Sequence, residues 1–236
     1  MTALNKNQHG SHVRRMFGEI AGKYDLINRL MTFGQDRVWR QCVVQAAGVP
    51  TNGILLDTGT GTGGIALDAL KADTTLNVVA ADFTVEMMLM GRRKQNGSRI
   101  TWAAADALAL PFEDAFFDAV TSGYLIRNVS DARQAFTEQT RVVKPGGRVV
   151  CLETSPPPEG LLRPILLLFL NHLIPLLGQI VSGNRPAYTY LPQTTQNFLS
   201  PLKVAAIMRS AGLTNIRYQR FMFGTIAVHV GVKPGA

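Results

Sequence analysis

The stretch Gly53-Ile-Leu-Leu-Asp-Thr-Gly-Thr-Gly-Thr-Gly-Gly64 places a short apolar run before an aspartate, Asp57, and then a loop rich in glycine. The apolar run predicts a buried strand that ends at Asp57 and turns through the glycines into a helix starting near Ile65. Because glycine lacks a Cβ, a ligand can lie almost against the backbone of such a loop. The stretch therefore predicts a nucleotide-type site, with a Gly/Thr turn that binds nothing as the alternative.

The spacing of the glycines selects among nucleotide ligands. A dinucleotide fold uses G-x-G-x-x-G to seat a pyrophosphate, whereas Gly59, Gly61 and Gly63 fall at every second residue and no G-x-x-x-x-G-K-[ST] run is present. An acid just before the loop suits a ligand that carries a positive charge. S-adenosylmethionine, with its ammonium and sulfonium groups, fits this pattern better than a phosphate does.

Composition limits the class of protein. The 236 residues are 46% hydrophobic and 17% charged with a net charge of +8, which predicts one globular domain and allows an anionic substrate, nucleic acid or membrane surface as partner. Cys42 and Cys151 lie apart in apolar elements, which predicts buried thiols in a reducing compartment rather than a disulfide or a metal site. Residues 1–12 have no apolar core of a signal peptide, so a cytoplasmic protein is expected.

The core of the chain alternates between strands and helices. Strands are predicted at 53–57, 77–82, 100–104, 117–123 and 147–153, with helices at 64–72, 84–95 and 131–143. This order implies a parallel, doubly wound α/β sheet. A predicted helix at 202–211 and hairpin at 214–221 and 225–232 follow, giving the seven-stranded, mostly parallel, Rossmann-like sheet expected of a class I methyltransferase.

The remaining segments are predicted to surround this core within a single domain. We expect a loose tail at 1–12, a helical cap at 13–48, the cofactor-binding core at 49–153, an apolar insert on the substrate side at 154–200, and the C-terminal helix and hairpin at 201–236. Residues 161–181 have the length of a membrane span, but two prolines, Arg163, Asn171 and His172 interrupt them. They predict an amphipathic helical insert, and peripheral contact with an anionic bilayer is a hypothesis.

Acidic side chains end the second and third predicted strands. Asp82, followed by Phe83, can accept hydrogen bonds from both hydroxyls of a ribose, or it can cap the next helix. Asp106, followed by Ala107, can reach an adenine amino group, or it is a plain loop acid.

The fourth predicted strand ends at Gly123-Tyr124, shortly before Arg127-Asn128. A cation and an amide there point to the crevice where open α/β sheets bind ligands, with a surface arginine and helix caps as the alternative. The run at 144–147 is predicted to be a tight turn into the fifth strand.

From residue 13 onward the sequence resembles the ubiquinone/menaquinone biosynthesis C-methyltransferases. The matching motifs, beside the glycine loop, are Ala21-Gly-Lys-Tyr-Asp25 with Asn28, Arg37-Val-Trp39-Arg, Ala104-Ala-Asp106-Ala-Leu-Ala-Leu-Pro-Phe112, Arg127-Asn-Val-Ser-Asp131, Arg141-Val-Val-Lys-Pro-Gly-Gly147 and Tyr188-Thr-Tyr-Leu191. The glycine loop and Lys-Pro-Gly-Gly occur in many methyltransferases, whereas the Lys-Tyr-Asp, Arg-Asn-Val-Ser-Asp and Tyr-Thr-Tyr-Leu blocks are more specific.

The resemblance implies methylation of a ring carbon of a prenylated quinol by S-adenosylmethionine. Donor-binding residues would be Asp57, Gly59, Gly61, Thr62, Gly63, Asp82, Phe83, Asp106, Ala107 and Gly123; residues facing the acceptor would be Tyr24, Tyr124, His172, Tyr188 and Tyr190, with Arg127 and Asn128 catalytic. Arginine hardly ever loses its proton, so we assign Arg127 an electrostatic role on a phenolate. The general base stays open, with His172, Tyr188 and Tyr190 as candidates.

The sequence also departs from the family pattern. Gly64 stands where an aspartate usually closes the glycine loop, Gly123 stands where a serine is common, and Leu125-Ile126 replaces Gly-Leu. A methyltransferase for another small or lipid acceptor, or a non-catalytic module that binds S-adenosylmethionine, therefore stays open. A homodimer is allowed, while nucleic-acid binding is not expected, because the basic residues are scattered.

Overall fold

The computed structural model describes residues 6–182 and 185–235, and the side chains among them except those of residues 6–12, 182, 185–189 and 191. The described strands form one seven-stranded sheet. The order is β3-β2-β1-β4-β5-β7-β6, and among the strands of the described chain β7 runs opposite to the other six. The strands are β1 (Ile54–Thr58), β2 (Asn77–Asp82), β3 (Thr101–Ala104), β4 (Phe117–Gly123), β5 (Val143–Thr154), β6 (Thr214–Phe221) and β7 (Ile226–Val232). The predicted fold class is confirmed.

The order of strands reverses at the centre of the sheet. β1 pairs in parallel with β2 on one side and with β4 on the other. The chain crosses over at this point, so the connections leave in opposite directions and open a crevice at the carboxyl ends of the strands. The glycine loop follows β1 directly and lies in that crevice.

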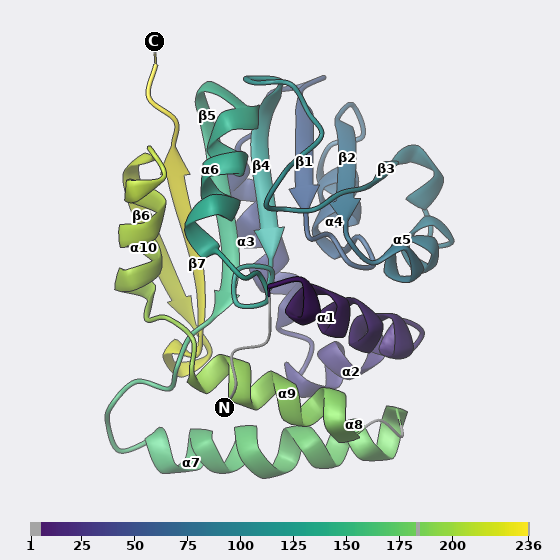
Figure 1. Cartoon of the computed structure of the whole chain (residues 1–236), viewed down its shortest axis with the longest axis vertical. Helices are drawn as coiled ribbons and strands as arrows, with labels where there is room; N and C mark the ends of the chain where they lie inside the picture. Colours follow the sequence, from purple (N-terminus) through teal and green to yellow (C-terminus); the bar gives the residue numbers. More distant parts are fainter. Residues whose placement is uncertain (1–5, 183–184, 236) are drawn as a thin grey trace.

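Helices cover both faces of the sheet (Figure 1). On one face α3 (Asp36–Ala47) and α4 (Gly64–Ala72) bury Trp39 and Leu70 against the strands. On the other, α6 (Ala132–Val142) and α10 (Pro201–Ser210) bury Phe136 and Met208, while α5 (Val85–Arg92) lies beside β2 and β3. Asp131 caps α6 by accepting from the amide of Gln134 at 3.0 Å. The two apolar clusters pack closely against the sheet and hold the strands in fixed relative positions. The carboxyl ends of the strands therefore form a rigid edge.

A third group of helices lies below the carboxyl ends of the strands, as Figure 1 shows. It comprises α1 (Lys6–Ile20), α2 (Tyr24–Met31), α7 (Arg163–Leu168), a π-helical turn (Phe169–Leu173), α8 (Ile174–Ser182) and α9 (Arg185–Gln196). We call this group the helical cover. Its own apolar cluster joins segments distant in sequence, namely Met16, Ile20, Ile27, Met31, Leu170 and Ile174. The cover therefore closes the crevice from the side opposite the glycine loop.

The structure differs from the predicted elements in three places. Residues 6–12, predicted as a loose tail, belong to α1, and residues 1–5 lie outside the described part. The predicted helical cap at 13–48 consists of three helices, with a break between Ile20 and Tyr24 and another before Asp36. The run at 144–147 is a bulge within β5 rather than a turn before it, because the pairing register with β4 shifts there. A Cβ at Gly147 would lie 2.7 Å from the carbonyl oxygen of Asp118, so this close approach of backbones needs glycine.

Candidate active site

Two adjoining cavities lie between the sheet and the helical cover. The helix-lined cavity, of about 380 Å³, extends under α2, α3 and the α7–α8 segment. The strand-tip cavity, of about 360 Å³, extends along the ends of β2 and β3 toward α1. Five residues line both cavities: Tyr24, Gly59, Gly61, Gly123 and Tyr124. Two ligands placed in these cavities would therefore meet at the glycine loop and the end of β4.

The glycine loop has a backbone that other residues rarely adopt. Gly59, Gly61 and Gly63 have φ values of +63°, +55° and +76°. A Cβ at Gly59 would lie 2.7 Å from Cδ1 of Leu125, and one at Gly63 would lie 2.6 Å from Cη2 of Trp102. Both the conformation and the packing therefore require glycine. Gly59 and Gly61 border both cavities, which suits a ligand that contacts the backbone.

Asp57 is a buried carboxyl group at the end of β1. One oxygen accepts from the hydroxyl of Thr60 at 2.6 Å, and the other accepts from the hydroxyl of Thr121 at 2.8 Å. Burial raises the pKa of Asp57 to about 6, although the two hydroxyl groups oppose this shift. Asp57 lines the helix-lined cavity, so at neutral pH it presents a negative charge to a cationic ligand.

The predicted adenosyl residues come together around the strand-tip cavity: Asp82, Phe83, Asp106 and Ala107. Asp82 joins the loop to β2, since its two oxygens accept from the amides of Gly61 and Thr84 at 2.7 Å each. The N-cap of α5 is Thr84, so the alternative that Asp82 caps this helix is wrong. Asp106 accepts from the amide of Leu108 at 2.9 Å. The ring of Phe83 is 47% exposed and lies under the guanidinium of Arg14.

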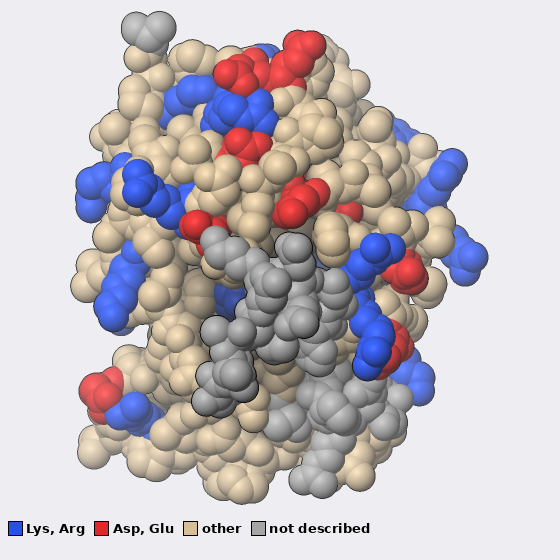
Figure 2. Space-filling view, in the orientation of Figure 1, with Lys and Arg blue, Asp and Glu red and all other residues tan. Residues whose placement is uncertain are grey.

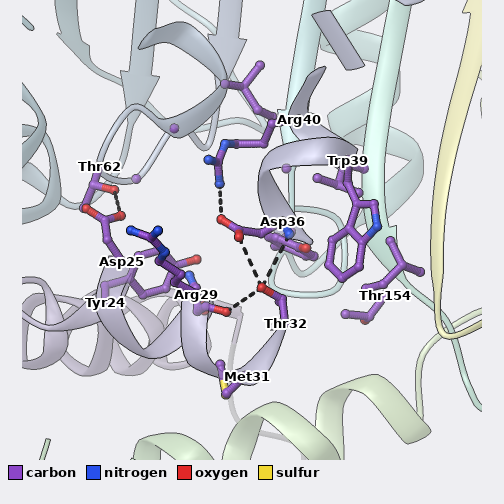
Figure 3. A pocket seen from close by; sticks show the side chains of 18 of the residues that line it. Tyr24, Asp25, Arg29, Met31, Thr32, Asp36, Trp39, Arg40, Thr62 and Thr154 are labelled. Carbon is purple, nitrogen blue, oxygen red and sulfur yellow. Dashed lines mark hydrogen bonds and ion pairs between the residues drawn. The ribbon is translucent and has the colours of Figure 1, made fainter. Parts of the chain in front are cut away.

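Thr62 is held by residues that the sequence did not single out. Its hydroxyl donates to Asp25 of α2 at 2.6 Å (Figure 3). Asp25 forms an ion pair with Lys94, whose ammonium also donates to the carbonyl oxygen of Thr62 at 3.0 Å. These contacts tie the helical cover to the glycine loop. The motif that contains Lys23 to Asp25 was the available signal, but its spacing alone does not reveal a contact with Thr62.

Arg127 forms an ion pair with Glu153, at the end of β5. Both side chains are buried, with 3% and 0% exposed, and Glu153 also accepts from the backbone amide of Arg127 at 3.2 Å. The guanidinium lies 5.0 Å from the ring centre of Tyr124 and lines the helix-lined cavity. Its Nε atom is buried and has no hydrogen-bond partner among the described residues. Arg127 thus retains one donor that a ligand could use.

Asn128 links the end of β4 to the helical cover. Its amide group donates to the carbonyl oxygen of Tyr124 at 2.8 Å, and its Oδ1 accepts from the hydroxyl of Tyr190 at 3.2 Å. Burial raises the pKa of Tyr24, Tyr124 and Tyr190 alike. These phenols therefore stay protonated at neutral pH, which disfavours Tyr190 as the general base.

Two other predicted acceptor residues have different outcomes. His172 is exposed in the π-helical turn and lines neither cavity, so its predicted place facing the acceptor is wrong. The neighbouring Phe169 and Leu170 face the cavity instead. Tyr188 lies in α9, but its side chain is outside the described residues.

Arg40 occupies the space beside Gly64. A Cβ at Gly64 would lie 3.1 Å from Cδ of Arg40. This arginine bonds Asp68 at 2.7 Å and forms an ion pair with Asp36, which Figure 3 shows at the cavity wall. Asp68 lies one helical turn after Gly64, so a carboxylate is present close to the position where the sequence lacks one. A Cβ at Gly123 would meet only the flexible end of Ile65, at 2.9 Å.

Comparisons with known proteins show which proteins the chain is similar to. The model of the ubiE/COQ5 methyltransferase family matches residues 1–233. The chain is 44% identical to the ubiquinone/menaquinone biosynthesis C-methyltransferase UbiE of Desulfotalea psychrophila, over 95% of this chain and 91% of that protein. It is 42% identical to the demethylmenaquinone methyltransferase of Roseiflexus castenholzii, over 97% of this chain and 96% of that protein.

A solved structure supports the fold. Phosphoethanolamine N-methyltransferase 2 of Haemonchus contortus, in complex with S-adenosylhomocysteine, has a TM-score of 0.62 and 18% identity. The alignment covers 83% of this chain and 52% of that one. At this level of identity the likeness concerns the arrangement of strands and helices.

Proposed function

Because the chain belongs to the ubiE/COQ5 methyltransferase family, and is a methyltransferase, we propose that it transfers a methyl group from S-adenosylmethionine to a ring carbon of a prenylated quinol. The observation that carries this proposal is the pair of cavities that meet at Gly59 and Gly123. The strand-tip cavity is lined by acids at strand ends, and the helix-lined cavity has one apolar wall, formed by the α7–α8 segment, facing charged residues of α2, α3 and α4. A donor and an apolar acceptor would therefore be held end to end beside Arg127.

The donor is assigned to the strand-tip cavity and the glycine loop. Asp82 and Asp106 would hold the ribose and the adenine, while the loop and Asp57 would hold the methionine part. S-adenosylmethionine supplies an electrophilic methyl group on a sulfonium. The residues fit it because the glycines of the loop present backbone without side chains, and Asp57 faces the neighbouring end of the helix-lined cavity as a carboxylate at neutral pH. Asp25 and Asp68 line the same cavity and add negative charge where the methionine part would extend from the loop.

The acceptor is assigned to the helix-lined cavity. A ring carbon attacks well only after a neighbouring hydroxyl has lost its proton, and a guanidinium stabilises the resulting phenolate. Arg127 is positioned for that role by Glu153, and its unpartnered Nε can donate to the phenolate oxygen. Leu166, Phe169, Leu170 and Ile174 form an apolar wall that suits the prenyl tail. The general base, the cytoplasmic location and a homodimer stay predictions.

The proposal is tested by product analysis. Purified protein is incubated with S-adenosylmethionine and a panel of quinols with and without prenyl tails, and mass spectrometry locates the added methyl group. We expect a ring C-methyl on the prenylated quinols. Methylation of other small or lipid molecules alone would favour the alternative acceptor, while calorimetric binding of S-adenosylmethionine without product from any acceptor would favour a non-catalytic module.

A second experiment tests the placement of Arg127. We expect Arg127→Ala to reduce turnover on the order of 100-fold, as loss of a donor to a developing oxyanion does, while the affinity for S-adenosylmethionine stays near that of the wild type. An equal loss of both quantities would show that Arg127 serves the donor or the fold. Arg133→Ala, an exposed arginine on α6, is the control and leaves both quantities unchanged.

A further inference from the structure

The helix built from α7, the π-helical turn and α8 has apolar side chains on two faces. Toward the protein, Leu170 and Ile174 are buried in the cluster of the helical cover and line the helix-lined cavity. The outward side carries large exposed side chains, with exposed fractions of 63% for Ile165, 61% for Leu168, 53% for Leu176 and 71% for Ile180. An exposed apolar surface of this kind marks a contact with another apolar phase.

The exposed surface continues onto α2 and the turn that follows it. Leu30 and Phe33 are 42% and 73% exposed, and the rings of Phe33 and Phe169 lie 6.0 Å apart. We call the surface formed by Ile165, Leu168, Leu176, Ile180, Leu30 and Phe33 the outer apolar face. Along the lower edge of the molecule, where Figure 1 places α7, Figure 2 shows few charged atoms.

The C-terminal third of the chain, which supplies this helix, has a one-sided charge. Residues 160–236 contain seven lysines and arginines and no aspartate or glutamate, although the whole chain has 16 acidic residues. The net charge of +8 thus arises almost entirely from this part of the chain. Five of the seven lie at positions 203–233, on α10 and in and after the C-terminal hairpin, so this charge attracts the whole molecule toward an anionic surface.

The helix is long and apolar enough to cross a bilayer, with a mean hydropathy of 1.8 over Arg163–Val181. One side of it, however, packs on α2 and α9 and lines a cavity. A helix with one side packed on protein and the other apolar and exposed is suited to lie along a membrane surface.

We propose that the outer apolar face docks on the surface of an anionic phospholipid bilayer. This inference rests on the proposed function, because an acceptor with a prenyl tail resides in lipid. Docking would leave a single helix between the helix-lined cavity and the lipid phase, with that helix contacting lipid on its outward side and the acceptor on its inward side. The acceptor could then reach Arg127 without passing its tail through water.

Vesicle flotation with the full chain tests the docking. The vesicles contain either phosphatidylcholine alone or equal parts phosphatidylcholine and phosphatidylglycerol. We expect binding to the anionic vesicles that weakens with salt, and at least a tenfold loss for the double variant Ile165→Glu/Ile180→Glu. The control is Leu89→Glu on α5, where the leucine is 50% exposed. Unchanged vesicle binding by the double variant, or equal binding to both kinds of vesicle, would overturn the proposal.

Folding and self-association are measured on the same samples. Because the substituted side chains are exposed, we expect circular dichroism and the affinity for S-adenosylmethionine to match those of the wild type. If sedimentation shows a dimer that the double variant breaks, and no protein floats with vesicles, the outer apolar face is an interface between copies and the proposal is wrong.

The quinol assay separates this proposal from the proposed function. With a water-soluble quinol that has a very short tail and no vesicles, wild type and double variant should have equal turnover. With a long-tailed quinol in anionic vesicles, the double variant should lose at least tenfold. Salt-sensitive flotation with no methylated quinol would refute the proposed function alone. Turnover with equal vesicle activity for both proteins would refute the docking alone.

Discussion

The glycine loop and the helical cover form opposite walls of one site, but different forces hold them. The loop consists of consecutive residues whose backbone is left-handed at Gly59, Gly61 and Gly63 and touches neighbouring side chains directly. The cover joins the N-terminal helices to α7–α9 through an apolar cluster and a few polar contacts, such as Tyr190 to Asn128. The glycine loop, which we call the donor wall, is therefore defined by the shape of its backbone. The helical cover, which we call the acceptor wall, is defined by side-chain packing, so its residues can vary more freely.

The largest effect is expected from a Cβ in the loop. Gly59→Ala places an alanine in a left-handed backbone conformation and brings its Cβ to 2.7 Å from Leu125. Together these should destabilise the native conformation of the loop by about 3 kcal/mol. If the loop shifts to relieve this, the affinity for S-adenosylmethionine should fall about 100-fold, as measured by calorimetry. Gly146→Ala is the matched control, since Gly146 has φ +79° and no atom within 4 Å of the added Cβ. Equal losses in both variants would show that close contact at the loop is unimportant.

The second effect concerns the buried ion pair of Arg127 and Glu153, beside the ends of β4 and β5. Glu153→Gln leaves the charge of Arg127 buried and unpaired, which should lower the free energy of unfolding by about 3–5 kcal/mol and reduce kcat more than donor affinity. Urea unfolding and steady-state kinetics measure the two effects. Asp118→Asn is the control, because its partner Lys144 is 42% exposed and such pairs contribute about 0–1 kcal/mol.

A double variant separates stability from positioning at this pair. Replacing both charges, as in Arg127→Met/Glu153→Leu, should recover stability without recovering turnover. Recovered turnover would contradict the assignment of Arg127 to the acceptor.

The third effect is a pH dependence of stability that is caused by Asp57, just before the glycine loop. The pKa of Asp57 is raised from 3.8 to about 6 in the folded protein, so between these values the folded state binds more protons than the unfolded state. Stability should therefore fall as the pH rises from about 4 to about 6, by about 3 kcal/mol, and then stay level. Asp57→Asn should remove this fall in urea unfolding and weaken donor binding about tenfold at neutral pH. If stability still falls over this pH range in the variant, a titrating group other than Asp57 causes the fall.

The smallest effects on turnover are expected from substituting two side chains of the helical cover, Tyr190 and His172. Tyr190→Phe removes the hydrogen bond to Asn128, which should lower kcat about fivefold, the equivalent of about 1 kcal/mol. His172→Ala should leave turnover of a water-soluble quinol unchanged, since His172 is exposed and lines neither cavity. A larger loss for His172→Ala than for Tyr190→Phe would reverse our placement of the acceptor.

The sequence by itself determined the elements of the sheet and the position of the donor wall. Asp57 and Asp82 were recognised as strand ends because strands and tight loops leave short-range patterns, and parallel strands bring such ends to one edge. Arg127 and Asn128 were singled out by their place after the fourth predicted strand, and their catalytic role came from the family resemblance. Glu153 was not found, because the apolar run before it indicates a buried strand without showing which side chain it contacts.

Only the tertiary structure decided how the cover meets the sheet. In residues 161–181 most positions are apolar, so the pattern does not reveal which face is inward. The inward face is set by the packing of Leu170 and Ile174 in one apolar cluster with Met31 and Ile27, which leaves His172 exposed to solvent. The contact of Asp25 with Thr62 and the pairing of Glu153 with Arg127 likewise join residues far apart in the chain. Local backbone preferences are encoded in neighbouring residues, whereas the inward face of an apolar helix is fixed only when its partners are in place.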